Sequence, residues 1–161
     1  HLALSHYHWD HTANANAFAG ATWLVRESER QAMLEKPIGT ARPATYDALR
    51  KSRTVMVSND EHDVFGDGRV ILKAAPGHTP AHQVLYVKLA KTGGVLLSGD
   101  LYHYRQERTL DRLPTFEFDE AQTRVSGRAV EAFLKKTGAA LWIQHELPAH
   151  AKLRKAPAYY E

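Results

Sequence analysis

The stretch SHYHWDH, residues 5–11, carries four side chains that restrict how this chain can fold: His6, His8, Asp10 and His11. Imidazoles and carboxylates are poor core material, and protonated imidazoles this close together repel one another. In an extended segment, residues two apart point to the same face, so His6, His8 and Asp10 share one side, and His11 turns back as a helix begins. Because Asp10 and His11 diverge from the first pair, the spacing favours two adjacent metal ions, and other segments must supply the remaining ligands.

The composition narrows the kind of site that is possible. The chain has 161 residues and no cysteine, so disulfides and thiolate metal ligands are excluded, while ten histidines offer nitrogen ligands. Its length suits one domain, which we expect to span residues 1–161. The net charge is only +3 and the lysines and arginines are spread along the chain, which does not indicate a nucleic-acid partner. No apolar run is long enough to predict a membrane-spanning helix.

Apolar runs alternate with helical patterns along the chain, which predicts the α/β class. Strands are expected at residues 2–5 (a buried one), 21–26, 54–58, 69–75, 83–90, 94–99 and 140–144. Helices are expected at residues 11–20 (ended by Gly20), 26–36, 43–52 and 119–138, the last with Val125 among its apolar positions. Residues 65–69 and 91–94 read as hairpin turns, and the acidic run at residues 59–63 reads as a polar loop.

Three further candidate ligands follow directly after expected strands. His78 comes just beyond one strand, Asp100 beyond another and His145 beyond the last. Sheets of α/β proteins build their sites at the carboxyl ends of their strands, so these side chains are expected to converge with those of SHYHWDH. A carboxylate such as that of Asp100 can bridge two ions with its two oxygens.

The pattern HxHxDH followed by a distant His, Asp and His resembles the metallo-β-lactamase-fold hydrolases. The resemblance implies an αββα sandwich, with His6, His8 and His78 as ligands of a first metal. It also implies Asp10, His11 and His145 as ligands of a second metal and Asp100 as the bridge. It covers about the C-terminal two thirds of such a domain, so the expected fold lacks the strands that the family carries before the motif.

Within that family, PGHTPAHQ and SGDLYHY are most similar to the N-acyl homoserine lactonases. The resemblance implies opening of a lactone ring by a metal-bridging hydroxide, with Asp10 carrying a proton to the leaving oxygen. Lactonases often have a tyrosine three residues after the bridging aspartate. His103 takes that place here, so Tyr102, His103 and Tyr104 are all candidate catalytic residues. Zinc suits the ligands, and iron, manganese or cobalt can occupy such sites.

Several alternatives stay open at the level of the sequence. The same fold could hydrolyse a thioester, as in glyoxalase II, or a phosphodiester with help from Arg105 or Arg108, or the chain could be a non-catalytic metal-binding fragment. The expected partner is a small ester or lactone, and a homodimer is conceivable if sheet edges are exposed. His82 is expected to support a ligand rather than bind metal, and Trp9, Trp23 and Trp142 are expected to pack. The compartment of this bacterial-type protein, cytoplasmic or periplasmic, is undetermined.

Overall fold

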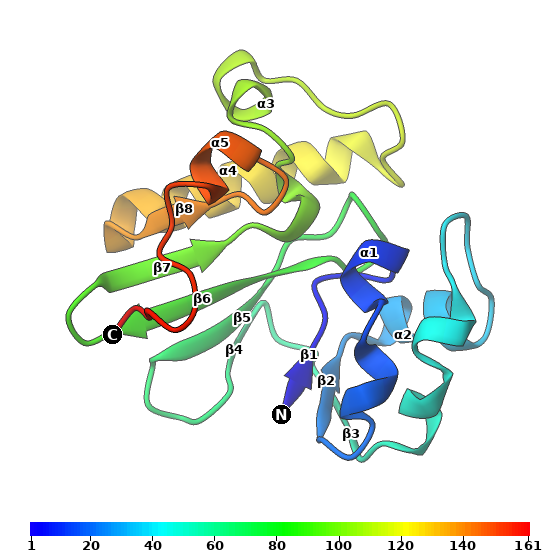
Figure 1. Cartoon of the computed structure of the whole chain (residues 1–161). Helices are drawn as coiled ribbons and strands as arrows, with labels where there is room; N and C mark the ends of the chain where they lie inside the picture. Colours follow the sequence, from blue (N-terminus) through cyan, green and yellow to red (C-terminus); the bar gives the residue numbers. More distant parts are fainter.

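The computed structural model describes residues 1–161 and contains two β-sheets that face each other, each covered on its outer side by helices (Figure 1). The first sheet has the order β1-β2-β3, and all of its strands are parallel. Its strands are β1 (Leu2–Ala3), β2 (Trp23–Val25) and β3 (Thr54–Met56). This layering is the expected αββα sandwich.

The second sheet places the ends of three strands along one edge. Its order is β4-β5-β6-β7-β8, antiparallel from β4 to β7 and parallel between β7 and β8. The strands are β4 (Glu61–Asp63), β5 (Val70–Ala74), β6 (Gln83–Leu89), β7 (Gly93–Leu97) and β8 (Ala140–Trp142). Because β5, β7 and β8 run in the same direction, their carboxyl ends meet at the same edge of the sheet.

Nine helical segments connect and cover the strands. They are α1 (Trp9–Thr12), η1 (Ala15–Phe18), α2 (Glu27–Leu34), η2 (Pro43–Thr45), η3 (Asp47–Lys51), η4 (Gly99–Leu101), α3 (Arg105–Leu110), α4 (Glu120–Thr137) and α5 (Leu147–His150). Helix α4 is delimited as its sequence predicts: the Asp119 carboxylate accepts a hydrogen bond from Gln122 N, and Gly138 adopts a left-handed φ of 68° after the last turn. None of these helices has the length and apolar character needed to cross a bilayer.

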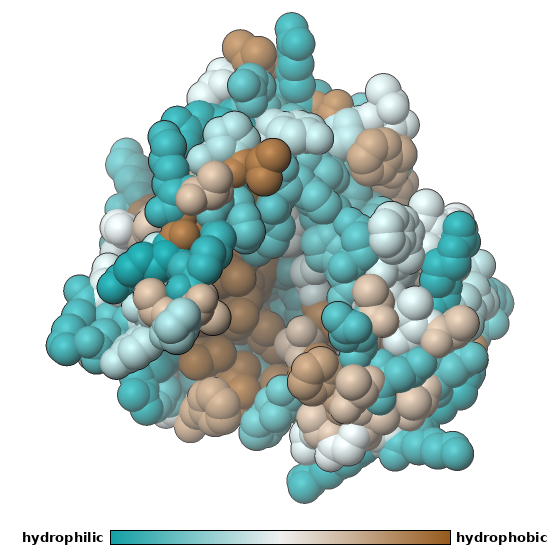
Figure 2. Space-filling view, in the orientation of Figure 1, coloured by the Kyte–Doolittle hydropathy of each residue, from teal (hydrophilic) through white to brown (hydrophobic).

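The buried apolar residues form three clusters. One joins β2 to α2, η1 and η3 around Trp23, Met33 and Tyr46. A second joins the other sheet to α4 around Leu96 and Val130. The third lies where the inner faces of the two sheets meet, and it is small. Beside it a cleft of about 250 Å³ opens between the sheets, and Figure 2 shows its hydrophobic lining at the centre of the molecule.

The structure corrects three predictions about secondary structure and adds two helices. Residues 59–63 are not all loop, because Glu61–Asp63 pairs with β5; the Asp63 carboxylate accepts hydrogen bonds from three backbone N–H groups of the following turn, which favours this hairpin. The strand at residues 2–5 contains only two residues and is not buried. The helix at residues 11–20 is divided into α1 and η1, since the Asn16 side chain bonds to the η2–η3 segment. Finally, Val125 of α4 is exposed, and α3 and α5 were not expected.

Candidate metal centre

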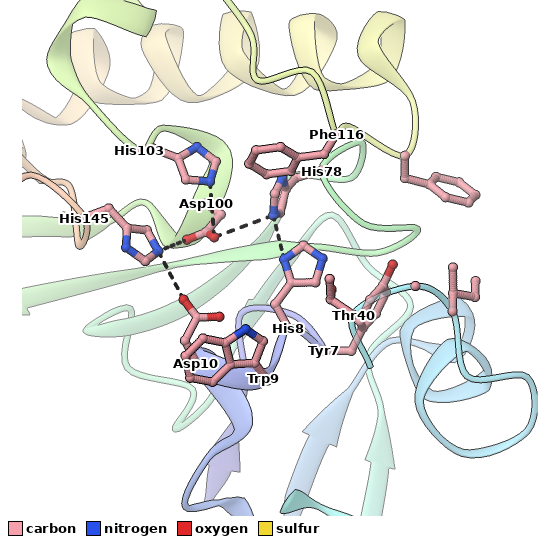
Figure 3. A pocket seen from close by; sticks show the side chains of 13 residues that line it. Tyr7, His8, Trp9, Asp10, Thr40, His78, Asp100, His103, Phe116 and His145 are labelled. Carbon is pink, nitrogen blue, oxygen red and sulfur yellow. Dashed lines mark hydrogen bonds and ion pairs between the residues drawn. The ribbon is translucent and has the colours of Figure 1, made fainter. Parts of the chain in front are cut away.

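All seven candidate ligands lie together at the edge where the strands of the second sheet end. Figure 3 shows those of them that also line the pocket: His8, Asp10, His78, Asp100 and His145. His6 and His8 follow β1, whereas Asp10 and His11 belong to α1. His78 lies between β5 and β6, Asp100 lies in η4 after β7, and His145 follows β8. They form two groups that share Asp100: His6, His8, His78 and Asp100, and then Asp10, His11, His145 and Asp100. The expected convergence of strand ends therefore holds in the structure.

In the first group the ligand atoms face one another at short range. His78 Nε2 lies 3.1 Å from His8 Nδ1. Asp100 Oδ2 lies 3.5 Å from His6 Nε2 and 3.6 Å from His78 Nε2. Three nitrogens and one carboxylate oxygen thus surround one point.

The second group has the same geometry around the other oxygen of Asp100. Its Oδ1 lies 3.0 Å from His11 Nε2 and 3.2 Å from His145 Nε2. These two nitrogens are 3.3 Å apart, and each lies 3.5 Å from Asp10 Oδ2. Asp100 therefore turns one oxygen toward each group, as a bridging carboxylate would.

These distances fit metal ions. Four ligand atoms arranged tetrahedrally at a zinc–nitrogen distance of ~2.05 Å are about 3.3 Å from one another. The separations given above run from 3.0 to 3.6 Å, and all ligand atoms of each group lie within 4.8 Å of one another. Two ligand atoms, His6 Nε2 and Asp100 Oδ1, are also buried without a hydrogen-bond partner in the protein. Buried polar atoms are rarely left unpaired, so these two call for a partner that is not a protein group. The donor set of nitrogen and oxygen atoms fits two divalent ions.

The protonation states favoured by the site are the ones that bind metal. Burial, together with repulsion from the neighbouring imidazoles, holds the pKa of His6 well below its usual value and lowers the pKa of His8 to about 4. Burial alone would raise the pKa of Asp100, but the contacts with His103 and His11 and the nearby His6 bring it far below the usual range. Neutral imidazoles beside an ionised carboxylate leave lone pairs free for a cation.

Hydrogen bonds behind the ligands orient the imidazole rings. Ser5 Oγ lies 3.1 Å from Nδ1 of both His6 and His11, and its two lone pairs allow it to accept from both rings. That arrangement leaves both Nε2 atoms turned toward the centre. His82 lies behind Asp100: it is fully buried, donates from Nδ1 to Ala75 O and accepts at Nε2 from the backbone N–H of Asp100.

Glu29 was not identified from the sequence, yet it connects two loops that carry ligands. Its buried carboxylate accepts hydrogen bonds from the backbone N–H groups of Tyr7 and Ala81 and from the hydroxyl of Thr79. Tyr7 stands between His6 and His8, and Thr79 follows His78. The only signal in the sequence is that Glu29 lies at helical spacing from the apolar residues at positions 32 and 33, on the buried side of α2.

A pocket of about 530 Å³ opens onto the two groups of ligands. Besides the ligands, its wall contains Tyr7, Trp9, Ile38, Gly39, Thr40, His103, Phe116 and Phe118, and it contains no lysine or arginine. Trp9 was expected to pack, but it is 56% exposed and faces this pocket (Figure 3), because the short helix α1 turns it away from the core. Trp23 is buried and Trp142 packs edge-on against Tyr160.

The three candidate catalytic residues that follow Asp100 have side chains in different environments. His103 lines the pocket, with Nε2 3.3 Å from Asp100 Oδ2 and its ring stacked on that of His145. Tyr102 does not reach the pocket, since it is buried under α4 and its hydroxyl donates to Glu131. Tyr104 is also turned away, at the start of α3, and is 54% exposed. Successive side chains of extended backbone alternate in direction, which is why only the middle residue faces the site.

Comparisons with known proteins agree with this geometry. The metallo-beta-lactamase superfamily profile matches residues 1–145. N-acyl homoserine lactonase AttM of Azorhizobium caulinodans is 29% identical over 100% of this chain and 63% of its own length, and AiiA of Bacillus thuringiensis subsp. kurstaki is 24% identical over 99% and 60%. The chain thus spans about 60% of the length of these curated relatives.

Solved structures show the same fold. A B. thuringiensis AiiA variant with N-decanoyl-L-homoserine bound at its active site superposes with a TM-score of 0.85 at 24% identity, over 99% of this chain and 60% of the other. The dizinc quorum-quenching lactonase AidC gives a TM-score of 0.63 at 18% identity, over 87% and 55%. With the family profile matching most of its length and its candidate ligands gathered at the strand ends, the chain belongs to the metallo-beta-lactamase superfamily.

Proposed function

We propose that this chain is the catalytic part of a metal-dependent hydrolase that opens the ring of N-acyl homoserine lactones. The observation that carries the proposal is the pair of ligand groups sharing Asp100 at the floor of an open pocket. The curated relatives that match nearly the whole chain are named N-acyl homoserine lactonases. Two divalent ions, for which zinc suits the ligands and iron, manganese or cobalt are the alternatives, would supply Lewis acidity and an activated water at neutral pH.

His6, His8 and His78 would hold the first ion, Asp10, His11 and His145 the second, and Asp100 both. The other roles follow from where side chains stand around the pocket. Asp10 is half-exposed at the rim, where its carboxylate can carry a proton to the departing alkoxide. His103 faces the same space, in the place where lactonases often have a tyrosine; its Nε2 is turned to Asp100 Oδ2, and its ring would contact the bound substrate.

The wall of the pocket supports a neutral substrate over a phosphodiester. A phosphate group carries negative charge that basic side chains usually balance, and the pocket contains none. Arg108 is instead paired with both oxygens of Glu131, and Arg105 lies 3.7 Å from Glu146. The aromatic and aliphatic residues at the rim, Trp9, Ile38, Phe116 and Phe118, suit an acyl chain.

The experiment that tests this function combines elemental analysis with a pH-indicator assay. Protein purified without added metal is analysed for metal per chain and then mixed with a long-chain N-acyl homoserine lactone, whose hydrolysis releases acid. We expect about two metal ions per chain and acid release that is lost in Asp10→Asn. Asp47→Asn is the matched control, because Asp47 is an exposed carboxylate paired with Arg50 and remote from the pocket.

The alternatives give different outcomes in the same experiment. Two metal ions with hydrolysis of a thioester or a phosphodiester, but not of a lactone, would keep the metal centre and replace the substrate. Metal binding without turnover of any of the three would indicate a non-catalytic metal-binding fragment. Sedimentation of the same samples tests for the homodimer that the sequence left open, for which the hydrophobic cleft between the sheets is the candidate surface.

A further inference from the structure

The segment that joins α3 to α4 touches the metal centre from outside the ligand set. Its residues Phe116 and Phe118 line the pocket with mostly exposed rings, whereas the side chain of Glu117 between them is fully buried. The backbone is bound to the loop that carries His78: Phe118 N donates to His78 O, and Asp119 N donates to Gly77 O at 2.8 Å. Alternate side chains of this segment thus face the substrate pocket and the metal ligand.

Glu117 makes two contacts that fix its carboxylate. Its Oε1 lies 2.9 Å from His78 Nδ1, and its Oε2 accepts a hydrogen bond from the hydroxyl of Thr123 in the first turn of α4. Neither lysine nor arginine pairs with Glu117, so its ion-pair contact is the imidazole alone. A carboxylate only accepts hydrogen bonds, so Nδ1 of His78 must carry the proton.

The position of the His78 loop against α4 is equally constrained. Gly77 has a φ of 132°, and a Cβ built on it would stand 2.2 Å from Thr123 N. Only glycine permits this approach, so the loop and the start of α4 form one closely packed unit. Glu117 lies inside this unit, and its side chain and the ring of His78 are both fully buried against each other.

We propose that Glu117 is a positioning residue of the metal centre, which holds His78 as the Nδ1–H tautomer and so directs the lone pair of Nε2 at the first ion. Nε2 is the atom that faces His8 Nδ1 and Asp100 Oδ2. Carboxylates placed behind ligating histidines orient the ring and raise its basicity, and their loss typically weakens metal binding by about 10–100-fold. The proposal rests on His78 being a metal ligand. The proposal also implies that the segment with Phe116 and Phe118, which lines the pocket, is connected to His78 through Glu117.

Zinc affinity, measured by competition with a chromophoric chelator, tests the proposal without reference to any substrate. We expect Glu117→Ala to weaken one of two sites by about 10–100-fold and to leave the other unchanged. Glu117→Gln should lose less, because its amide oxygen still accepts from His78 and its amide N–H can donate to Thr123. Glu120→Gln is the matched control: Glu120 is exposed three residues further on and its carboxylate makes no hydrogen bond or ion pair, so the affinities of this variant should equal those of the wild type.

A second readout uses the metal-free protein. The ¹⁵N resonances of the His78 ring, assigned through their absence in His78→Gln, report which nitrogen carries the proton. The wild type should show the Nδ1–H tautomer, and Glu117→Ala should populate the Nε2–H tautomer. Folded Glu117→Ala protein with wild-type zinc affinity, or an unchanged tautomer, would overturn the proposal. A wild-type chain that binds no zinc would refute the metal centre itself, and the tautomer would then decide whether Glu117 orients His78.

Discussion

The buried carboxylate of Glu29 makes a prediction that can be worked out from the structure in detail. It sits on α2 and accepts from two backbone N–H groups, of Tyr7 on one oxygen and of Ala81 on the other, and from the Thr79 hydroxyl. Burial raises the pKa of Glu29 from 4.5 to about 7, although these hydrogen bonds favour the ionised form. We therefore expect Glu29→Gln to change how the stability of the protein depends on pH.

Two opposing effects set the magnitude. Between pH 4.5 and pH 7 the folded chain holds a proton that the unfolded chain has released, so stability falls as pH rises. At about 1.4 kcal/mol per pKa unit, this loss amounts to about 3 kcal/mol in the wild type. Glutamine does not ionise and escapes that loss. Its amide nitrogen, however, replaces one acceptor oxygen and leaves a buried N–H unpaired, which costs about 1–3 kcal/mol.

Urea unfolding followed by circular dichroism at pH 5 and pH 8 measures both effects. At pH 5 we expect Glu29→Gln to be less stable than the wild type by about 1–3 kcal/mol. At pH 8 the difference should vanish or change sign, because the wild type is then ionised. Glu27→Gln, an exposed change on the same helix, should alter stability by less than about 0.5 kcal/mol at both pH values.

The reasoning fails if the difference between Glu29→Gln and the wild type is the same at pH 5 and pH 8. A constant deficit would mean that Glu29 stays ionised throughout and that its three donors outweigh burial. A variant as stable as the wild type at pH 5 would mean that neither backbone N–H depends on the carboxylate. The first result would refute the raised pKa of Glu29, and the second would remove Glu29 as the link between the loops of Tyr7 and Thr79.

Three further predictions concern the centre and its pocket. Asp100→Asn should reduce the metal content from about two ions to one or none by elemental analysis, since each oxygen of Asp100 serves one ligand group; two tightly held ions would contradict a bridging role. Phe116→Ala should raise KM for a decanoyl lactone more than for a hexanoyl lactone in steady-state assays, because each methylene group that loses contact with the ring costs about 0.8 kcal/mol of binding free energy. Equal changes in the two KM values would place the acyl chain elsewhere. Burial lowers the pKa of His82 to about 3, so between pH 6.5 and pH 3 the unfolded chain takes up a proton that the folded chain does not, and the protein should lose stability as pH falls. His82→Gln should reduce this loss in thermal unfolding curves recorded across that pH range; an unchanged pH profile would show that His82 does not have to stay neutral in the fold.

The convergence of the seven candidate ligands could be predicted from the sequence because its geometry is mostly local. The spacing of His6, His8, Asp10 and His11 follows from how an extended segment enters a helix, and the other ligands each come directly after an apolar strand. The boundaries of α4 were also predictable, because its cap residues Asp119 and Gly138 act on the neighbouring turn. Where the local structure is decided by residues close together in the sequence, the residue types alone are enough to predict it.

Other features depend on contacts between segments far apart in the sequence. Glu29 is 52 residues from Ala81 and Glu117 is 39 residues from His78. Only the helical spacing of Glu29 from positions 32 and 33 distinguishes it from a solvated glutamate, and Glu117 has no such local signal. The direction of Tyr102, His103 and Tyr104 was open as well, because it depends on how the chain leaves β7 beneath α4. The sequence by itself determined which groups could bind a metal. Only the tertiary structure decided which carboxylates stand behind them, because burial and distant hydrogen bonds, not residue type, set those roles.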